Sequence, residues 1–256
     1  MPGSAHLTPA LVLGSLRYGE TSRIVRLATR DGGVLSAIAK GALRPRSRFG
    51  AALQLLSEGQ AHLLPSRSSE LHTLVAFDVV DLHTGLASSL DRFAAANALA
   101  ELVTHFAPPA PNPALFDLIH DSIALLELAP PEAISVVGIR AMWAVVTELG
   151  LGPILSECAR DARPLPSGQV AFSLSDGGFL CASCAASGKS TRLGSEDREA
   201  LVSLIERDGD LPVLSPPQAA AHRRLLARWV RQHLGGDGSF PALDGWERGG
   251  PGSRSS

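Results

Sequence analysis

The 256-residue chain is 45% hydrophobic and 19% charged, an ordinary composition for a globular protein of one to three domains. No apolar run approaches the roughly 20 residues that cross a bilayer, so no membrane partner is expected. The N-terminal sequence Met-Pro-Gly-Ser-Ala-His lacks the basic and apolar regions of a secretion signal. We therefore expect a cytoplasmic protein, in which three cysteines argue against a disulfide framework.

Charge is distributed unevenly along the chain, although the net charge is only −2. Residues 1–80 carry nine cationic and five anionic side chains, whereas residues 81–150 carry two and eight. A basic region joined to an acidic one suggests that only part of the surface meets a polyanion.

Residues 1–80 show the alternating pattern of β-strands. We predict five strands: one at Leu11–Leu13 that is broken between Gly14 and Gly19, and others at Ile24–Thr29, Val34–Ala39, Leu53–Leu64 and Leu71–Val79. Five short strands in about 75 residues fit a barrel of the oligonucleotide-binding (OB) type. A five-stranded SH3-like barrel fits the same strand count and remains the alternative.

A basic loop, residues 40–49, lies between the third and fourth predicted strands. It carries four cations and no acidic residue: Lys40, Arg44, Arg46 and Arg48. Pro45 blocks regular helix and strand, so the charges should be displayed on a loop. Such a loop suits the phosphates of a nucleic acid, and a solvated surface loop is the alternative.

Residues 81–153 change to helical periodicity and predict a helical domain with three helices. The stripes run from Leu86 to Phe106, from Leu115 to Leu126 and from Ile134 to Leu149, and Trp143 is expected in their core. Residues 193–235 predict two more helices, near 195–207 and 217–234. A row of three arginines on the last helix indicates a solvated face or a second polyanion contact: Arg224, Arg228 and Arg231. The Gly-, Ser- and Pro-rich residues 236–256 predict a disordered tail.

Residues 154–192 hold all three cysteines and little apolar periodicity. Cys181 and Cys184 form a Cys-x-x-Cys pair, and Cys158 is followed at the matching spacing by Asp161. Structural zinc sites typically combine two such pairs, and an aspartate oxygen can supply the fourth ligand. We expect a zinc site formed by Cys158, Asp161, Cys181 and Cys184, with a metal-free segment of three ordinary thiols as the alternative.

No motif in the chain predicts catalysis. The stretch Ser187-Gly-Lys-Ser-Thr191 ends like a phosphate-binding P-loop, but Ser183 stands where the leading glycine should be. The histidines show no spacing that marks a catalytic triad, and paired cysteines favour a metal.

Taken in order, several stretches of residues 8–234 resemble the bacterial DNA repair protein RecO family. They are Lys40–Gln54, Glu70–Leu74, Pro111–Phe116, Glu148–Pro153, Cys158, Cys181-x-x-Cys184 and Arg228–Leu234. The resemblance implies an α+β protein with an N-terminal OB-fold (residues 1–80), a helical domain (81–153 and 193–235) and a zinc-finger-like insertion (154–192). This chain departs from the four-cysteine form of the family at Asp161.

The resemblance also implies a function, which is that of a nucleoid-associated recombination mediator. Such proteins bind single- and double-stranded DNA, anneal complementary strands and, with RecR, help RecA load onto DNA coated by single-strand-binding protein (SSB). We expect phosphate contacts from the four cations of the basic loop and then from Arg17 and Arg23. The alternatives from other classes are a protein-binding scaffold without direct DNA contact and a cysteine- or zinc-dependent hydrolase.

Overall fold

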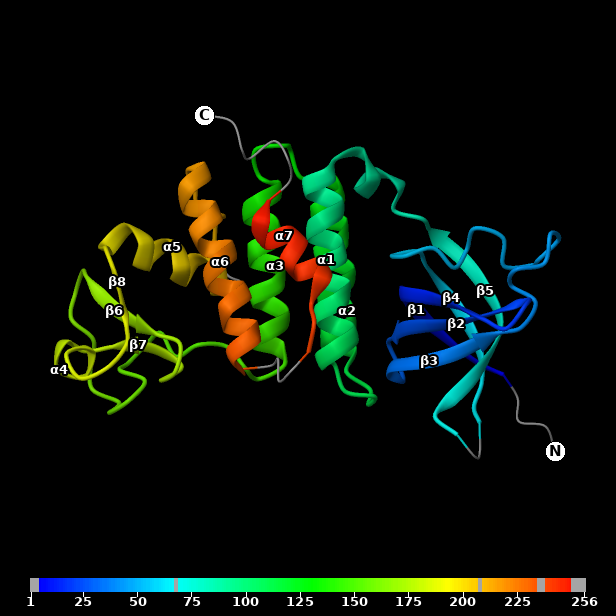
Figure 1. Cartoon of the computed structure of the whole chain (residues 1–256), viewed down its shortest axis with the longest axis horizontal. Helices are drawn as coiled ribbons and strands as arrows, with labels where there is room; N and C mark the ends of the chain where they lie inside the picture. The colour runs from blue at the N-terminus through cyan, green and yellow to red at the C-terminus, as the bar shows by residue number, and fades with distance from the viewer. Residues whose placement is uncertain (1–4, 67–68, 207–208, 234–237, 250–256) are drawn as a thin grey trace. The chain divides into compact units, whose positions relative to one another are not determined.

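The computed structural model describes residues 5–66, 69–206, 209–233 and 238–249 (Figure 1). The chain divides into two compact units, Met1–Leu128 and Ala129–Ser256. This division falls between the second and third predicted helices, so the first two helices belong with the barrel and not with the later helices. No helix among the described residues is both long and apolar enough to cross a membrane.

Five strands of the first unit form a closed barrel in the order β1-β2-β3-β5-β4. Their bounds are β1 His6–Tyr18, β2 Ser22–Thr29, β3 Gly33–Ala39, β4 Glu58–Leu64 and β5 Leu71–Asp81. Strand β1 pairs with both β2 and β4, and β3 pairs in parallel with β5. This crossed order is that of the five-stranded Greek-key OB-fold, which confirms the predicted fold class.

Strand β1 corrects one prediction, because no break occurs between Gly14 and Gly19. The strand continues to Tyr18, and its ladder with β2 shifts register between Val12 and Gly14. A bulge of this kind bends a strand and increases its twist. The bend lets one strand of 13 residues pair with β4 through its first half and with β2 through its second.

Strand β4 begins at Glu58, five residues later than predicted. The residues before it form turns, and Leu53 and Leu56 are buried within them. Leu53 belongs to the barrel core and is apolar for that reason, whereas Leu55, its neighbour in the predicted alternation, is only half-buried. In β5 the buried residues are Leu74 and Phe77, which are three residues apart because the β4–β5 ladder shifts register between His62 and Leu63. Val79 is 41% exposed.

The helices of the first unit are η1 Thr84–Ser88, α1 Leu90–Phe106 and α2 Pro113–Leu128. Helix α1 contacts β1 and β2, and the α1–α2 connector lies against the β2–β3 turn. Gly33 in that turn has φ +70°, and a Cβ there would come within 2.2 Å of the Ala110 carbonyl oxygen. Glycine is therefore required for this close approach. Arg30 adds a bidentate ion pair to Asp117 at 2.9 and 3.0 Å.

The second unit contains helices and a small sheet. Its elements are α3 Ile134–Glu148, β6 Val170–Ser173, β7 Gly178–Leu180, α4 Ala182–Ala185, β8 Thr191–Leu193, α5 Ser195–Ile205, α6 Pro216–His233 and α7 Pro241–Arg248. The sheet has the order β7-β6-β8 and was not anticipated from the sequence. Helix α7 corrects the predicted tail, of which residues 236–237 and 250–256 lie outside the described residues.

Aromatic side chains connect the sheet of the second unit to its helices. Trp143 of α3 is fully buried, as predicted, and its ring lies 5.8 Å from that of Trp229 on α6. Phe172 of β6 lies 5.6 Å from Trp229 and 6.0 Å from Phe179 of β7. Helix and sheet therefore share one core, in which edge-to-face ring contacts add to the burial of apolar area.

Candidate nucleic-acid interface and metal centre

The basic loop connects β3 to the turns that precede β4 and is well anchored. Phe49 is only 2% exposed and belongs to the barrel core, as do Ala52 and Leu53 just beyond it. Successive turns fold the backbone: the Arg44 amide donates to the Gly41 carbonyl, and the Ser47 amide to the Arg44 carbonyl. The loop is thus a folded cap whose buried side chains hold it to the barrel.

All four cations of this loop are exposed: Lys40, Arg44, Arg46 and Arg48. None of them forms an ion pair with any of the residues that the structure describes. The Arg48 guanidinium carbon lies 5.3 Å from the Phe49 ring centroid, which steadies one arginine by a cation–π contact. The structure thus places four unneutralised cations on one loop, as the sequence suggested.

The β1–β2 hairpin lies beside this loop, because the Leu43 amide donates to the Thr21 carbonyl at 2.9 Å. Arg17 and Arg23 are directly opposite each other in the β1–β2 ladder. Like charges in that position repel each other, and an anion bound between them would relieve the repulsion. Arg17 is exposed, whereas Arg23 is half-buried and donates to Ser15 Oγ at 2.6 Å. Arg17 is therefore the more available of the two.

Two further cations of the barrel have partners within the fold. Arg30 is paired with Asp117, and Arg26 donates to Ser36 Oγ at 3.1 Å. On α6 of the other unit, Arg231 lies 2.6 Å from both Asp244 and Glu247 of α7. The predicted arginine row of α6 is therefore neutralised at one of its three positions.

Aromatic rings are scarce on the barrel. Of its three aromatic residues, Phe49 and Phe77 are buried, and only Tyr18 at the end of β1 is exposed, at 54%. Base stacking on such rings is a main source of affinity in single-strand binders. This surface can therefore offer many charges and little stacking.

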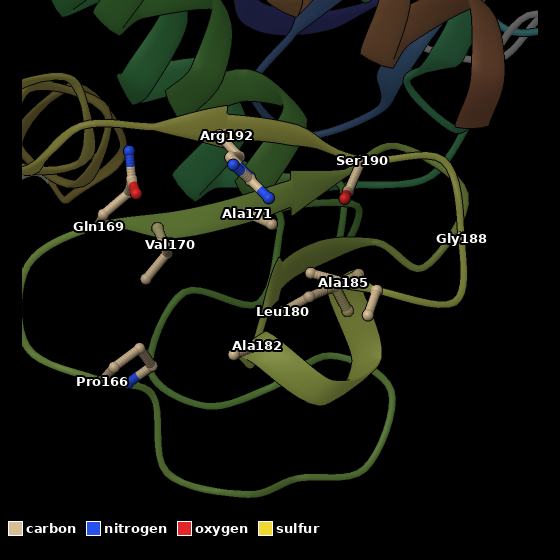
Figure 2. A pocket seen from close by; sticks show the side chains of 11 residues that line it. Pro166, Gln169, Val170, Ala171, Leu180, Ala182, Ala185, Gly188, Ser190 and Arg192 are labelled. Carbon is tan, nitrogen blue, oxygen red and sulfur yellow. The ribbon is translucent and has the colours of Figure 1, made fainter.

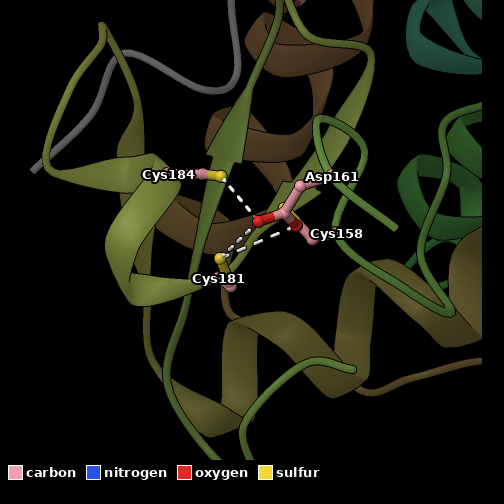
Figure 3. A group of neighbouring side chains, drawn as sticks. All are labelled: Cys158, Asp161, Cys181 and Cys184. Carbon is pink, nitrogen blue, oxygen red and sulfur yellow. Dashed lines mark hydrogen bonds between the residues drawn. The ribbon is translucent and has the colours of Figure 1, made fainter. Parts of the chain in front are cut away.

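The four predicted metal ligands come together in the second unit (Figure 3). Cys158, Asp161, Cys181 and Cys184 place their ligand atoms within 4.8 Å of one another. Asp161 Oδ2 lies 3.3 Å from Cys184 Sγ and 3.8 Å from Cys181 Sγ. Tetrahedral zinc with ordinary bond lengths would separate a sulfur from an oxygen ligand by about 3.5 Å. The donor set and its spacing therefore fit a zinc ion.

Local backbone geometry forms both halves of the cluster. The first half is a tight turn, in which the Ala162 amide donates to the Cys158 carbonyl and Ala162 adopts φ 56°. In the second half, Cys181 precedes the short helix α4, which contains Cys184. Arg160 joins the halves: it donates to the Cys184 carbonyl at 2.8 Å and forms a bidentate pair with Asp176 at 2.8 and 2.9 Å. Sequence reasoning missed Arg160, because nothing in its spacing marks it.

The acid–base properties of the cluster suit a metal. Hydrogen bonds from the thiols of Cys158 and Cys184 lower the pKa of Asp161 to about 2, so the carboxylate is charged. A hydrogen bond with Ser183 lowers the pKa of Cys181 to about 7. Burial and the neighbouring Asp161 raise the pKa of Cys184 to about 12. A cation would compensate the crowded negative charge and allow this last thiol to deprotonate.

A pocket of about 560 Å³ opens between the small sheet and α4 (Figure 2). Its lining includes Gly188 and Ser190 of the P-loop-like stretch, together with Arg192. This stretch leads into strand β8 and not into a helix, and α5 begins only at Ser195. A P-loop needs a helix N-terminus directly after its lysine to bind phosphate. The segment therefore lacks P-loop geometry.

Comparison with known proteins agrees with this architecture. Residues 4–83 match the family described as Recombination protein O N terminal, and residues 87–239 match Recombination protein O C terminal. The DNA repair protein RecO of Anaeromyxobacter sp. (strain K) is 34% identical over 233 residues, which cover 88% of this chain and 90% of that protein. The DNA repair protein RecO of Anaeromyxobacter dehalogenans (strain 2CP-C) is 33% identical over 231 residues, with the same coverage. The chain therefore belongs to the RecO family of DNA repair proteins.

Proposed function

We propose that this chain binds single- and double-stranded DNA through the barrel and anneals complementary strands without catalysing a chemical reaction. One observation carries the proposal: the basic loop, with four exposed cations, is hydrogen-bonded to the β1–β2 hairpin that carries Arg17, and none of these five cations is paired with a described carboxylate. Long cationic side chains displayed in this way contact phosphates and release their counterions. Membership of a DNA repair family supports the same conclusion.

Annealing follows from the character of this surface. Two DNA strands repel each other, and cations on the barrel screen the repulsion while both strands are held. Because phosphate contacts carry no sequence information and Tyr18 is the barrel's one exposed ring, each strand can slide until the bases match. Base pairing then supplies the free energy, so nucleotide hydrolysis is not required.

The finer role comes from the family resemblance. With RecR, the chain helps RecA load onto DNA coated by SSB, and the C-terminal tail of SSB is a further partner. This role places the protein in the cytoplasm at the nucleoid. A protein of this kind has to bind DNA weakly enough to release it, which agrees with contacts that are mainly electrostatic.

A structural zinc ion bound by Cys158, Asp161, Cys181 and Cys184 belongs to the same proposal. The cluster is the centre of a small core that contains Ala171 and Leu180. A core of this size supplies little hydrophobic stabilisation, and four protein ligands would close the coordination sphere of the ion. Its contribution would be to stability and not to DNA chemistry.

The test is fluorescence anisotropy of a labelled single-stranded oligonucleotide, titrated with protein at several salt concentrations. Direct phosphate contact requires log affinity to fall linearly with log salt. A strand-annealing assay with two complementary oligonucleotides then tests the second step. Absence of binding at low salt would refute the proposal and favour a scaffold that reaches DNA only through partner proteins.

A further inference from the structure

A second group of metal-ligand side chains lies in the first unit, at the junction between the barrel and α2. His83 lies two residues beyond the end of β5, and its side chain is only 5% exposed. Its Nδ1 lies 2.8 Å from Glu127 Oε2 of α2 and 3.9 Å from Asp81 Oδ2 at the end of β5. The ligand atoms of these three residues lie within 4.8 Å of one another.

The other polar atom of each of these residues is already held by a hydrogen bond. His83 Nε2 lies 3.2 Å from Glu58 Oε2, the Gly85 amide donates to Glu127 Oε1 at 2.7 Å, and the His83 amide donates to Asp81 Oδ1 at 2.7 Å. Both imidazole nitrogens thus lie within hydrogen-bond distance of a carboxylate, Nδ1 of Glu127 and Nε2 of Glu58. A metal ion at Nδ1 would replace the proton that this nitrogen shares with Glu127, while Nε2–H stays bonded to Glu58. A carboxylate behind a histidine in this way is the usual outer-shell arrangement of a metal-bound histidine.

The surroundings hold this arrangement in place. His120 Nδ1 lies 2.9 Å from Glu58 Oε2 and so orients the carboxylate behind His83. A Cβ on Gly85 would come within 2.6 Å of Glu127 Oε1, so glycine permits the approach of that carboxylate. Three carboxylates surround one buried imidazole, which leaves negative charge that a divalent cation would neutralise.

We propose that Asp81, His83 and Glu127 form a site for a divalent transition-metal ion such as Zn²⁺, which fastens the last barrel strand to α2. Zinc bound to a nitrogen and an oxygen at ordinary bond lengths would separate those two atoms by about 3.3 Å, which the two observed distances bracket. Three protein ligands leave a fourth position for water. The proposal concerns the barrel–helix junction and does not depend on DNA binding or on the cysteine cluster.

The test is the amount of zinc bound per full-length chain after chelation and equilibrium dialysis against buffered zinc chloride. If the cysteine cluster also binds, the unaltered chain holds two ions, C181S/C184S holds one, and Glu127→Gln holds one. Glu127→Gln keeps the size of the side chain and can still accept from Gly85. Asp121→Asn is the matched control, because it removes an exposed acid from the same helix and should change nothing.

Two further variants separate a metal site from a cluster of ion pairs. Asp81→Asn changes a side chain that is 56% exposed, so folding should persist while zinc affinity falls at least tenfold. Glu58→Gln should retain the ion and weaken its binding by about 10–100-fold, as expected for an outer-shell partner. Unchanged zinc content and affinity in both Glu127→Gln and Asp81→Asn would overturn the proposal and leave an ion-pair cluster only.

Discussion

The triple variant R44A/R46A/R48A tests the proposed DNA interface most directly. Each of these arginines is exposed and lacks an ion-pair partner among the described residues, so each can contact one phosphate. Every phosphate contact with a single strand adds about 0.7 to the slope of log affinity against log salt. Removal of three contacts should therefore reduce that slope by about 2.

The same relation gives the loss of affinity at a chosen salt concentration. At 0.1 M monovalent salt each contact contributes about 0.7 log units, so the triple variant should bind about 100-fold more weakly. The loss should be equal for oligothymidine and for a mixed sequence, because phosphate contacts do not distinguish bases. Anisotropy titrations at four or more salt concentrations measure both quantities.

The control is the triple variant K189A/R192A/R248A, which removes three exposed cations from the other unit. It changes the net charge of the chain by the same amount, so it separates the loss of local contacts from an effect of overall charge. The control should keep the slope of the unaltered chain. If R44A/R46A/R48A also keeps that slope while it remains folded, the basic loop does not contact DNA.

Three further predictions concern the second unit, which contains all three tryptophans and can be followed by their fluorescence. If zinc is bound, EDTA should lower the urea midpoint of this unit, and a midpoint that does not change with EDTA would contradict the zinc site. Asp161→Cys should tighten zinc binding, and Asp161→Ala should weaken it. Burial lowers the pKa of His222 despite the nearby Asp197. Below the unfolded-state pKa of about 6.5, the unfolded chain therefore binds a proton that the folded chain does not, so the free energy of unfolding falls as the pH falls, by up to about 1.4 kcal/mol per pH unit. That acid-sensitive loss should be absent in His222→Gln, and equal losses in both proteins would exclude His222 as its source. Phe172→Ala should destabilise the unit by about 3–5 kcal/mol, because it opens a cavity beside Trp229, and a loss below 1 kcal/mol would show that the sheet does not share the helical core.

The barrel was predictable because half-buried strands alternate in sequence, and β2 and β3 were located to within two residues. The errors arose where other constraints produced a similar pattern. Glycine at position 14 marks a bulge as readily as a break, and Leu53 is apolar because it fills the core from a turn. The short strands β6, β7 and β8 have three or four residues each, too few for periodicity to be visible.

The two sites were predictable to different degrees. The cysteine cluster could be found because metal ligands occur at fixed spacings, and Asp161 stood at the spacing of the missing thiol. Arg160 could not be found, because a hydrogen bond to the Cys184 carbonyl depends on how two loops fold and not on their sequence. His83 was missed for the same reason, since its partners Glu58 and Glu127 are 25 and 44 residues away.

The anchoring of the basic loop has a consequence for how DNA would be held. Phe49 and Leu53 keep the backbone of this region on the barrel before any ligand arrives, so binding need not order the loop at the expense of affinity. The exposed side chains of Lys40, Arg44 and Arg46 are long, so each can follow a phosphate that moves, whereas the Phe49 ring steadies Arg48. A preformed backbone that carries mobile charges favours rapid association and equally rapid exchange of strands. Phe49→Ala should therefore weaken DNA binding, although Phe49 is buried and contacts no phosphate. If the loop acted through its charge alone, this variant would bind DNA as tightly as the unaltered chain.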